Sequence, residues 1–207
     1  MNMQKQFFTL LAIVALLAMS ITTSLRATAG TVTSAKTSSS TAPVVWMSDG
    51  TTVPGAEASL TRNESGLTVN LHTNGLAPGA YSLWWGIYNH PENCGYDPCG
   101  GPPELGFPDD TNPAVQAFWV NATGHVAGRG QTDNFGAHLT IGGPYSGEII
   151  VNTAPGLLNP AGAQVQLILR YHGPAIPGMI PKQTSVYLGG CPDGGSPCED
   201  VQFVVFQ

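Results

Sequence analysis

Residues 66–73 read GLTVNLHT, and this stretch decides the fold class because its apolar and polar side chains alternate without a break. Successive side chains of a β-strand point to opposite faces. Leu67, Val69 and Leu71 would therefore face a core, while the threonine, asparagine and histidine side chains between them would face away from it. The stretch predicts a β-strand with one buried face.

The same alternation recurs along the chain, most clearly in residues 163–172 (AQVQLILRYH). Glycine and proline separate the apolar runs, which is typical of short antiparallel strands joined by turns. The strand candidates are residues 44–48, 58–62, 66–73, 80–89, 114–122, 124–131, 135–142, 147–152, 163–172, 183–188 and 200–206. They predict an all-β fold, an antiparallel β-sandwich of the immunoglobulin-like or jelly-roll-like type with roughly nine to eleven strands.

The first 29 residues have the pattern of a signal peptide. Lys5 precedes an apolar run at residues 7–19 that is too short to span a bilayer, and the segment Ala27-Thr28-Ala29 supplies the small residues of a cleavage site. We therefore predict a signal peptide over residues 1–29 and a secreted mature protein, extracellular or periplasmic. No second long apolar run follows, so no transmembrane segment is expected after cleavage.

The rest of the chain divides into a spacer and one domain. Residues 30–43 are rich in serine and threonine and predict a flexible spacer. Residues 44–207 would form a single β-sandwich domain, because they are enough to bury one sizeable core.

Charge excludes some partners. Charged residues make up only 10% of the chain, and cleavage after Ala29 would leave five basic residues against thirteen acidic ones, a net charge of −8. Such a surface repels phosphate backbones and anionic lipids, so we expect neither a nucleic-acid partner nor an anionic membrane surface. Oligomeric state is left open.

The four cysteines form two closely spaced pairs, Cys94 with Cys99 and Cys191 with Cys198, and each pair brackets glycine and proline. Four cysteines allow three pairings. The local pairing, with two small disulfide loops, is favoured because each loop closes without waiting for the sheet, although a long-range pairing stays open. A zinc site with His90 is the weaker alternative, since an oxidising compartment favours disulfides.

Residues 80–89 (AYSLWWGIYN) are apolar on both faces, which favours a central strand covered on both sides. The alternative is an exposed aromatic platform for sugar rings or a protein partner. The candidate binding surface comprises Trp84, Tyr88, Arg129, Arg170 and His172.

Three histidines, His125, His138 and His172, lie in strand candidates and form the candidate metal site. Neutral imidazoles suit copper or zinc, and three of them with an open position would fit a catalytic metal. Two loops also offer hard oxygens for calcium: Asp109, Asp110 and Asn112 in one, Asp193, Glu199 and Asp200 in the other. We expect no cofactor, with copper, zinc and calcium as the alternatives.

The sequence contains no G-x-S-x-G, H-E-x-x-H, phosphate-loop or dinucleotide-binding motif. This absence favours a protein without enzymatic activity. The leading hypothesis is an exported binding module for a protein or glycan partner at the cell surface. The alternative is a secreted copper or zinc protein that uses the three histidines as metal ligands. Its most specific version is an oxidoreductase.

Five segments resemble a family of secreted, β-rich bacterial proteins to which no activity is assigned: residues 84–94 (WWGIYNHPENC), 122–126 (ATGHV), 134–139 (NFGAHL), 172–178 (HGPAIPG) and 198–203 (CEDVQF). The resemblance spans about residues 66 to 206 and implies export and a β-rich domain. A looser likeness is to the CHRD domain of chordin-like proteins, but the H-x-H followed by glycines that is associated with that domain is missing.

Overall fold

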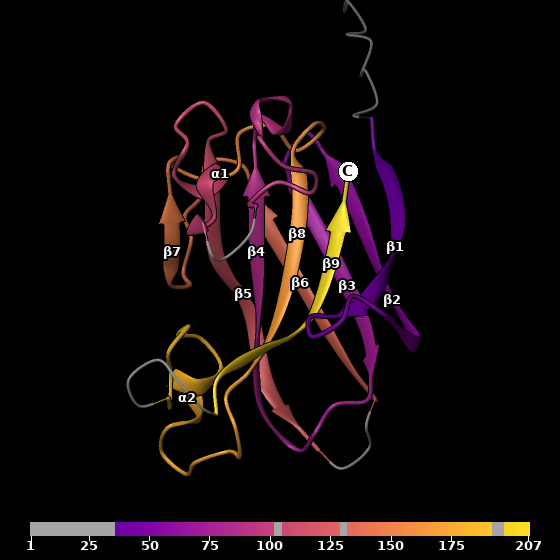
Figure 1. Ribbon diagram of the computed structural model, residues 1–207, viewed down its shortest axis with the longest axis vertical. Coiled ribbons are helices and arrows are strands. Elements are labelled where there is room, and N and C mark those ends of the chain that lie inside the picture. Colours follow the sequence, from indigo (N-terminus) through magenta and orange to yellow (C-terminus); the bar gives the residue numbers. More distant parts are fainter. Residues whose placement is uncertain (1–35, 102–104, 129–131, 192–196) are drawn as a thin grey trace, which may run out of the picture. The chain divides into compact units, whose positions relative to one another are not determined.

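The computed structural model describes residues 36–101, 105–128, 132–191 and 197–207. The expected signal peptide and the first residues of the expected spacer lie outside these ranges. The described residues form nine antiparallel strands in one curled sheet (Figure 1). Among them, no helix is long and apolar enough to cross a membrane.

The strands follow the order β6-β3-β2-β1-β9-β8-β4-β5-β7 across the sheet. Their bounds are β1 Ser38–Trp46, β2 Thr52–Asn63, β3 Gly66–Asn74, β4 Gly79–Tyr88, β5 Ala117–Ala127, β6 Thr132–Thr140, β7 Ile149–Asn152, β8 Gln164–Tyr171 and β9 Glu199–Phe206. In the described connections lie three short helices, η2 (Pro91–Asn93), α1 (Pro108–Thr111) and α2 (Ile180–Gln183).

The all-β antiparallel prediction is confirmed, but the strands are not divided into two separate sheets. β1 pairs with β2 along one edge, with a register shift between Pro43 and Val45, and it pairs with β9 along its other edge. The sheet curls so that β5 and β6, which are not neighbours in the strand order, contact each other. Apolar side chains from every strand except β7 meet in one core, with Leu67, Val69 and Leu71 among them.

Three sequence predictions need correction. Residues 114–122 and 124–131 were predicted as two strands, but residues 117–127 form the single strand β5, and residues 129–131 lie outside the described residues. β1 begins at Ser38, inside the segment predicted as a spacer, because residues 38–43 pair in register with β2. Residues 183–188 are not a strand. They continue from α2 as a series of turns in which Thr184 and Val186 donate backbone hydrogen bonds to the carbonyls four residues earlier along the chain.

β4 is buried on both sides, as the sequence favoured. Leu83, Trp85 and Ile87 face the core. The side chains on the other side of β4, together with their neighbours on β5 and β8, form what we call the covered face: Ser82, Trp84, Tyr88, Trp119 and Arg170. Two connections lie over it, residues 89–101 with α1 near one end and residues 172–191 with α2 near the other (Figure 1).

The Cys94–Cys99 disulfide lies within the first covering connection, and the Cys191–Cys198 disulfide joins the end of the second to the residue before β9. The local pairing predicted from the spacing is thus the one that forms. By contrast, the outer side of β2, β3 and β6 carries exposed or half-buried polar side chains; we call it the open face, and its members include Glu57, Ser59, Asn70, His72 and Asn134.

Candidate functional site

A groove of about 400 Å³ lies on the open face. Its polar lining comes from three neighbouring strands in two cross-strand rows. Glu57, His72 and Asn134 form the first row, and Ser59, Asn70 and Gly136 form the second. Leu71 and Phe135 also line it, but their side chains are buried in the core. The strand ladders therefore hold the polar groups of the groove at fixed spacings.

Hydrogen-bonding capacity in this groove is largely unused. His72 Nδ1 bonds to Asn134 Oδ1 at 2.8 Å. Within the described residues, no hydrogen bond involves the side chains of Glu57, Ser59 or Asn70. Ser59 and Asn70 can therefore donate to and accept from a ligand, and Glu57 can accept, without first breaking an internal bond.

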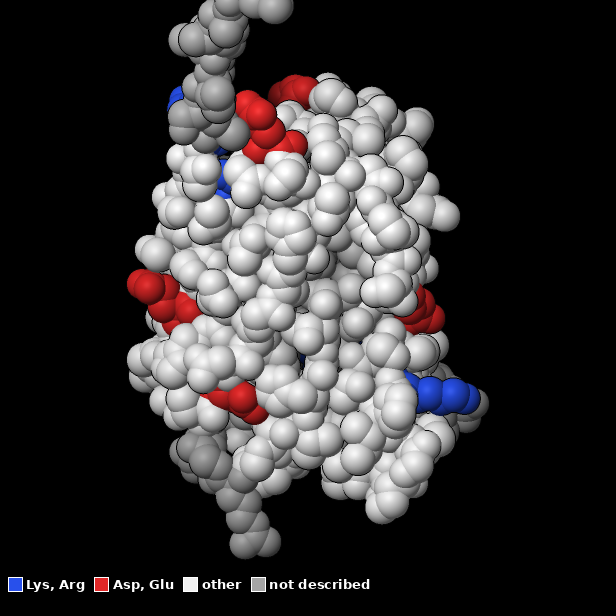
Figure 2. Space-filling model, turned by 180° about the vertical axis from the view of Figure 1, so that it is seen from behind, with Lys and Arg blue, Asp and Glu red and all other residues white. Residues whose placement is uncertain are grey.

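The groove is open because Gly136 has no side chain. A Cβ atom at Gly136 would meet Asn70 Oδ1 at 3.4 Å, an ordinary contact, so a larger residue would fit there and fill the groove. Charges on this side of the molecule are few. Figure 2, which views the molecule from behind, shows scattered acidic side chains, few basic ones and a wide uncharged area between them.

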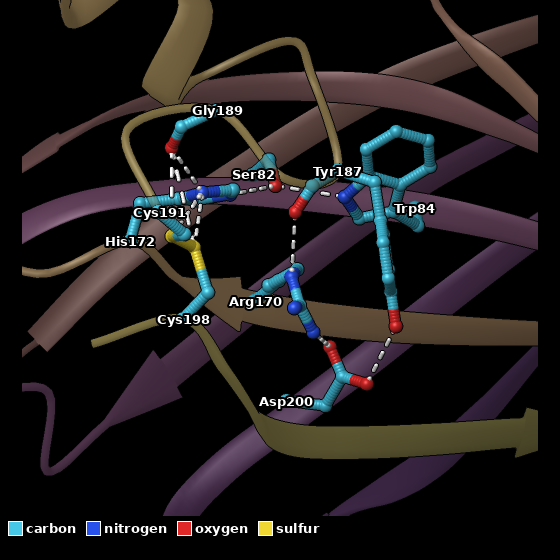
Figure 3. Close-up of polar contacts among 9 residues, drawn as sticks. All are labelled: Ser82, Trp84, Arg170, His172, Tyr187, Gly189, Cys191, Cys198 and Asp200. Carbon is cyan, nitrogen blue, oxygen red and sulfur yellow. Dashed lines mark hydrogen bonds and ion pairs between the residues drawn. A yellow bond between two sulfur atoms is a disulfide. The ribbon is translucent and has the colours of Figure 1, made fainter. Parts of the chain in front are cut away.

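The covered face holds a second group of polar side chains, shown in Figure 3. Trp84 Nε1 donates to Ser82 Oγ at 2.7 Å, and Ser82 Oγ lies 2.7 Å from His172 Nε2. His172 Nδ1 lies 2.9 Å from the carbonyl oxygen of Gly189 and 3.3 Å from Cys198 Sγ. Since the carbonyl can only accept, Nδ1 carries the proton and Nε2 accepts from the Ser82 hydroxyl.

A charged clamp lies beside this chain of hydrogen bonds. Arg170 donates to Asp200 Oδ1 at 2.6 Å and to the carbonyl oxygen of Tyr187 at 2.8 Å. Its guanidinium lies over the Tyr187 ring at 3.9 Å, and the Tyr187 hydroxyl donates to Asp200 Oδ2. The clamp therefore fastens the second covering connection to β8 and β9.

Serine beside histidine is the pairing used in nucleophilic catalysis, but this pair is not placed for it. Ser82 and His172 are both 0% exposed, so no substrate reaches the hydroxyl. Burial lowers the pKa of His172 to about 4, which keeps the ring neutral at neutral pH. Its Nδ1 faces a carbonyl rather than the carboxylate that would stabilise an imidazolium.

The three histidines predicted to share a metal do not converge. His125 lies on β5, where it pairs with Asp133 at 2.8 Å and stacks on Phe135. His138 bonds Thr68 across the open face, whereas His172 is buried at the start of the second covering connection. No group of potential metal ligands among the described residues unites them. Strand parity placed His138 and His172 opposite the apolar rows of their strands and His125 in a mostly polar segment, but it did not show that these strands lie in different parts of the sheet.

The predicted binding surface is also not a surface. Trp84, Tyr88, Arg170 and His172 all lie on the covered face or beneath its second connection, and each is at most 5% exposed. Arg129 lies outside the described residues. The structure thus brings Trp84, Arg170 and His172 into one region, but as a buried layer rather than a platform.

The oxygens proposed for calcium have internal partners in the first loop. Asp109 accepts backbone hydrogen bonds from Gly95 and Gly100, and Asp110 accepts from the Tyr88 hydroxyl and Trp119 Nε1. Burial raises the pKa of Asp110. Asp109 therefore ties α1 to residues 95–100 of the first covering connection, and Asp110 fastens α1 to β4 and β5.

The second proposed calcium set divides between two roles. Asp200 belongs to the Arg170 clamp and Glu199 begins β9, while Asp193 lies outside the described residues.

The groove was not predicted from the sequence. The only sequence feature that points to the groove is the row of polar side chains on residues 66–73. In the structure, the paired residues of β2 and β6 extend this polar row across the sheet. Only the register shows which residues these neighbours are. No family model, curated protein or solved structure matches this chain.

Proposed function

We propose that this chain is an exported, non-enzymatic binding module and that its ligand is a neutral glycan held in the groove of the open face. The observation that carries the proposal is the groove itself, a hollow of about 400 Å³ with three polar side chains that bond to nothing else in the described part of the chain. That volume lies in the range of small-ligand sites.

Glycan hydroxyls suit this lining because each one both donates and accepts a hydrogen bond. Asn70 and Asn134 offer amide donors and acceptors, Glu57 offers a carboxylate acceptor, and Ser59 offers a hydroxyl. None of the residues that line the groove in the described ranges is Lys or Arg. The groove therefore favours neutral sugars over sulfated or uronic-acid glycans, which Glu57 would repel.

Export is supported by the leader-like first 29 residues, by the two disulfides, which are typical of oxidising compartments, and by the resemblance to secreted bacterial proteins. A low-charge, polar surface also suits a protein that contacts cell-surface sugars. The proposal predicts binding without turnover, since neither the groove nor the buried Ser82–His172 pair offers an activated nucleophile.

The test is a binding screen with soluble oligosaccharides of glucose, galactose, mannose and N-acetylglucosamine, with heparin as the anionic comparison. We expect at least one neutral oligosaccharide to bind the wild-type protein and heparin not to bind. Gly136→Thr fills the groove and should abolish binding. Asn70→Ala should weaken it about 3- to 10-fold, the equivalent of one hydrogen bond.

Gly128→Thr is the matched control, because it makes the same substitution at an exposed glycine with open space around it, outside the groove. It should bind as the wild type does. If no neutral oligosaccharide binds, or if Gly136→Thr binds as well as Gly128→Thr does, the groove is not a glycan site. Specific retention of a protein partner by the wild-type protein, with no glycan bound, would also overturn the proposal.

A further inference from the structure

Four potential metal ligands converge where the two ends of the second covering connection meet (Figure 3). They are His172 Nδ1, the two sulfurs of the Cys191–Cys198 disulfide and the carbonyl oxygen of Gly189. Nδ1 lies 3.3 Å from Cys198 Sγ and 4.0 Å from Cys191 Sγ. The Gly189 oxygen lies 2.9 Å from Nδ1 and 3.7 and 4.0 Å from the sulfurs of Cys191 and Cys198.

These separations approach those of a tetrahedral ion. Zinc holds nitrogen or oxygen at about 2.0–2.2 Å and sulfur at about 2.3 Å, so neighbouring ligands at the tetrahedral angle lie about 3.3–3.8 Å apart. The five separations above lie within a few tenths of an ångström of this range. The sixth separation, between the two sulfurs, is shorter than this range because a covalent bond joins them. Reducing that bond would let the two sulfurs move apart to the distance that two zinc ligands need.

We propose that reduction of the Cys191–Cys198 disulfide creates a zinc site, with both thiolates and His172 as ligands and the Gly189 carbonyl at the fourth position. The reductant is a dithiol. It delivers two electrons and two protons to the disulfide, which becomes two thiols, and is itself oxidised to a disulfide. Zinc binding then releases the two thiol protons to solvent. This site lies apart from the groove and does not depend on the proposed glycan function.

The surroundings of His172 are those of a metal ligand. A ligating histidine nearly always hydrogen-bonds through its other ring nitrogen, which fixes the ring. Here Nε2 bonds to Ser82, and Ser82 is fixed in turn by Trp84 Nε1. The ring is 0% exposed, so its orientation is fixed by these contacts.

Zinc binding requires a tautomer change. In the disulfide form, Nδ1 carries the proton and donates it to Gly189. An ion on Nδ1 requires the proton on Nε2, where it would be donated to Ser82 Oγ. The proposal therefore predicts that the ring proton of His172 moves from Nδ1 to Nε2 when zinc binds. The ¹⁵N chemical shifts of the ring report this move directly.

The other disulfide supplies an internal control. Cys94 and Cys99 also have a third potential ligand nearby, the Asp109 carboxylate. However, the two oxygens of that carboxylate already accept backbone hydrogen bonds, at 2.8 Å from Gly95 and 3.0 Å from Gly100. Binding an ion there would compete with both bonds. Reduction of the first loop should therefore not create a comparable site.

The experiment is a Co²⁺ titration of the full chain, reduced with a phosphine under nitrogen, followed by displacement with Zn²⁺. We expect the reduced wild-type protein to take one equivalent of Co²⁺, with thiolate-to-cobalt charge-transfer absorption, and the oxidised protein to take none. C94S/C99S should retain the signal and C191S/C198S should lose it. Ser82→Ala should weaken binding about 10- to 100-fold, since it removes the group that orients the ring.

Two results would overturn the proposal: no charge-transfer signal in the reduced wild type, or an equal signal in C191S/C198S. Loss of the β-sheet circular dichroism on reduction would overturn it as well, because the site needs the folded sheet to hold His172. If a variant fails to fold, ¹⁵N spectra of the reduced wild type with Zn²⁺ decide the matter. The His172 proton must move to Nε2, and a proton that stays on Nδ1 contradicts the proposal.

Discussion

The covered face and the open face are outer sides of the same curled sheet, but they carry opposite kinds of side chain. The covered face carries Trp84, Tyr88 and Trp119, and two disulfide-closed connections bury them. The open face carries asparagine, serine, threonine and histidine, and its groove is accessible. In this sheet, aromatic side chains on both sides of β4 indicate that a further segment covers the strand. The polar outer side of β2, β3 and β6 has no such cover in the described residues, so a ligand can bind there.

The largest expected effect comes from removing the central aromatic side chain of the covered face. Trp84 is 0% exposed, packs edge-to-face on Tyr187 and donates to Ser82. Trp84→Ala should lower the free energy of unfolding by about 3–5 kcal/mol, because it leaves a cavity and removes the donor to Ser82. Urea denaturation measures this. A loss below about 1 kcal/mol would contradict the view that this face is a second core.

A somewhat smaller loss of stability is expected when the Asp109 carboxylate is removed from the first covering connection. Asp109 is 2% exposed and accepts backbone hydrogen bonds from Gly95 and Gly100. Asp109→Ala should lower the free energy of unfolding by about 2–3 kcal/mol, since the buried amide of Gly100 is left without an acceptor and the amide of Gly95 loses its bond as well. Hydrogen exchange should quicken at these two amides but not at those of the second connection. Uniform quickening over the whole sheet would show instead that the connection is not a separate unit.

Acid should weaken the covered face through His172 in the oxidised, metal-free protein. Burial is the main cause that lowers the pKa of His172 from 6.5 to about 4; Arg170 adds to it, and the Gly189 carbonyl and Asp200 oppose it. The unfolded chain therefore binds a proton between about pH 6.5 and 4 that the folded chain does not. Stability should be full above this window and fall as the pH drops through it.

Urea midpoints at several pH values between 7 and 4 measure this effect, with His172→Asn as the variant that removes it. His138→Asn is the control, because that ring is exposed on the open face. An unchanged pH dependence in His172→Asn would contradict the assignment of the effect to the buried ring.

The smallest effect on stability is expected on the open face. Gly136→Thr places a β-branched side chain on a strand where space exists, so the free energy of unfolding should change by less than about 0.5 kcal/mol. Chemical denaturation beside the wild type checks this. A loss of several kcal/mol would show that Gly136 serves the fold, and the binding defect of the variant would then say nothing of the groove.

Much of the fold could be predicted from the sequence, because it depends on local patterns. Strict alternation placed the strand at 66–73 within a residue of β3, and short cysteine spacing predicted both disulfides. Two predictions failed where pairing or packing overrode local composition. The residues from Ser38 look like a linker but pair with β2, and residues 183–188 look like a strand but are held as turns over Arg170.

The candidate sites were harder to predict, because they depend on which strands are neighbours. Parity gave the side of each strand but not the covering connection that buries Trp84 and His172. The groove needs the register that sets Asn70 beside Gly136, and these residues lie far apart in the sequence. Likewise, the approach of His172 to the second disulfide depends on the path of the chain from α2 to β9, on which the sequence carries no periodic signal.

The most direct test of the difference between the two faces is a map of backbone amide shifts when the bound oligosaccharide is added to ¹⁵N-labelled protein. We expect changes in amide chemical shift only in the strands that line the groove, around residues 57–59, 70–72 and 134–136, and no change at the amides of the covered face. Shifts centred on residues 84–88, with the groove amides unmoved, would contradict it.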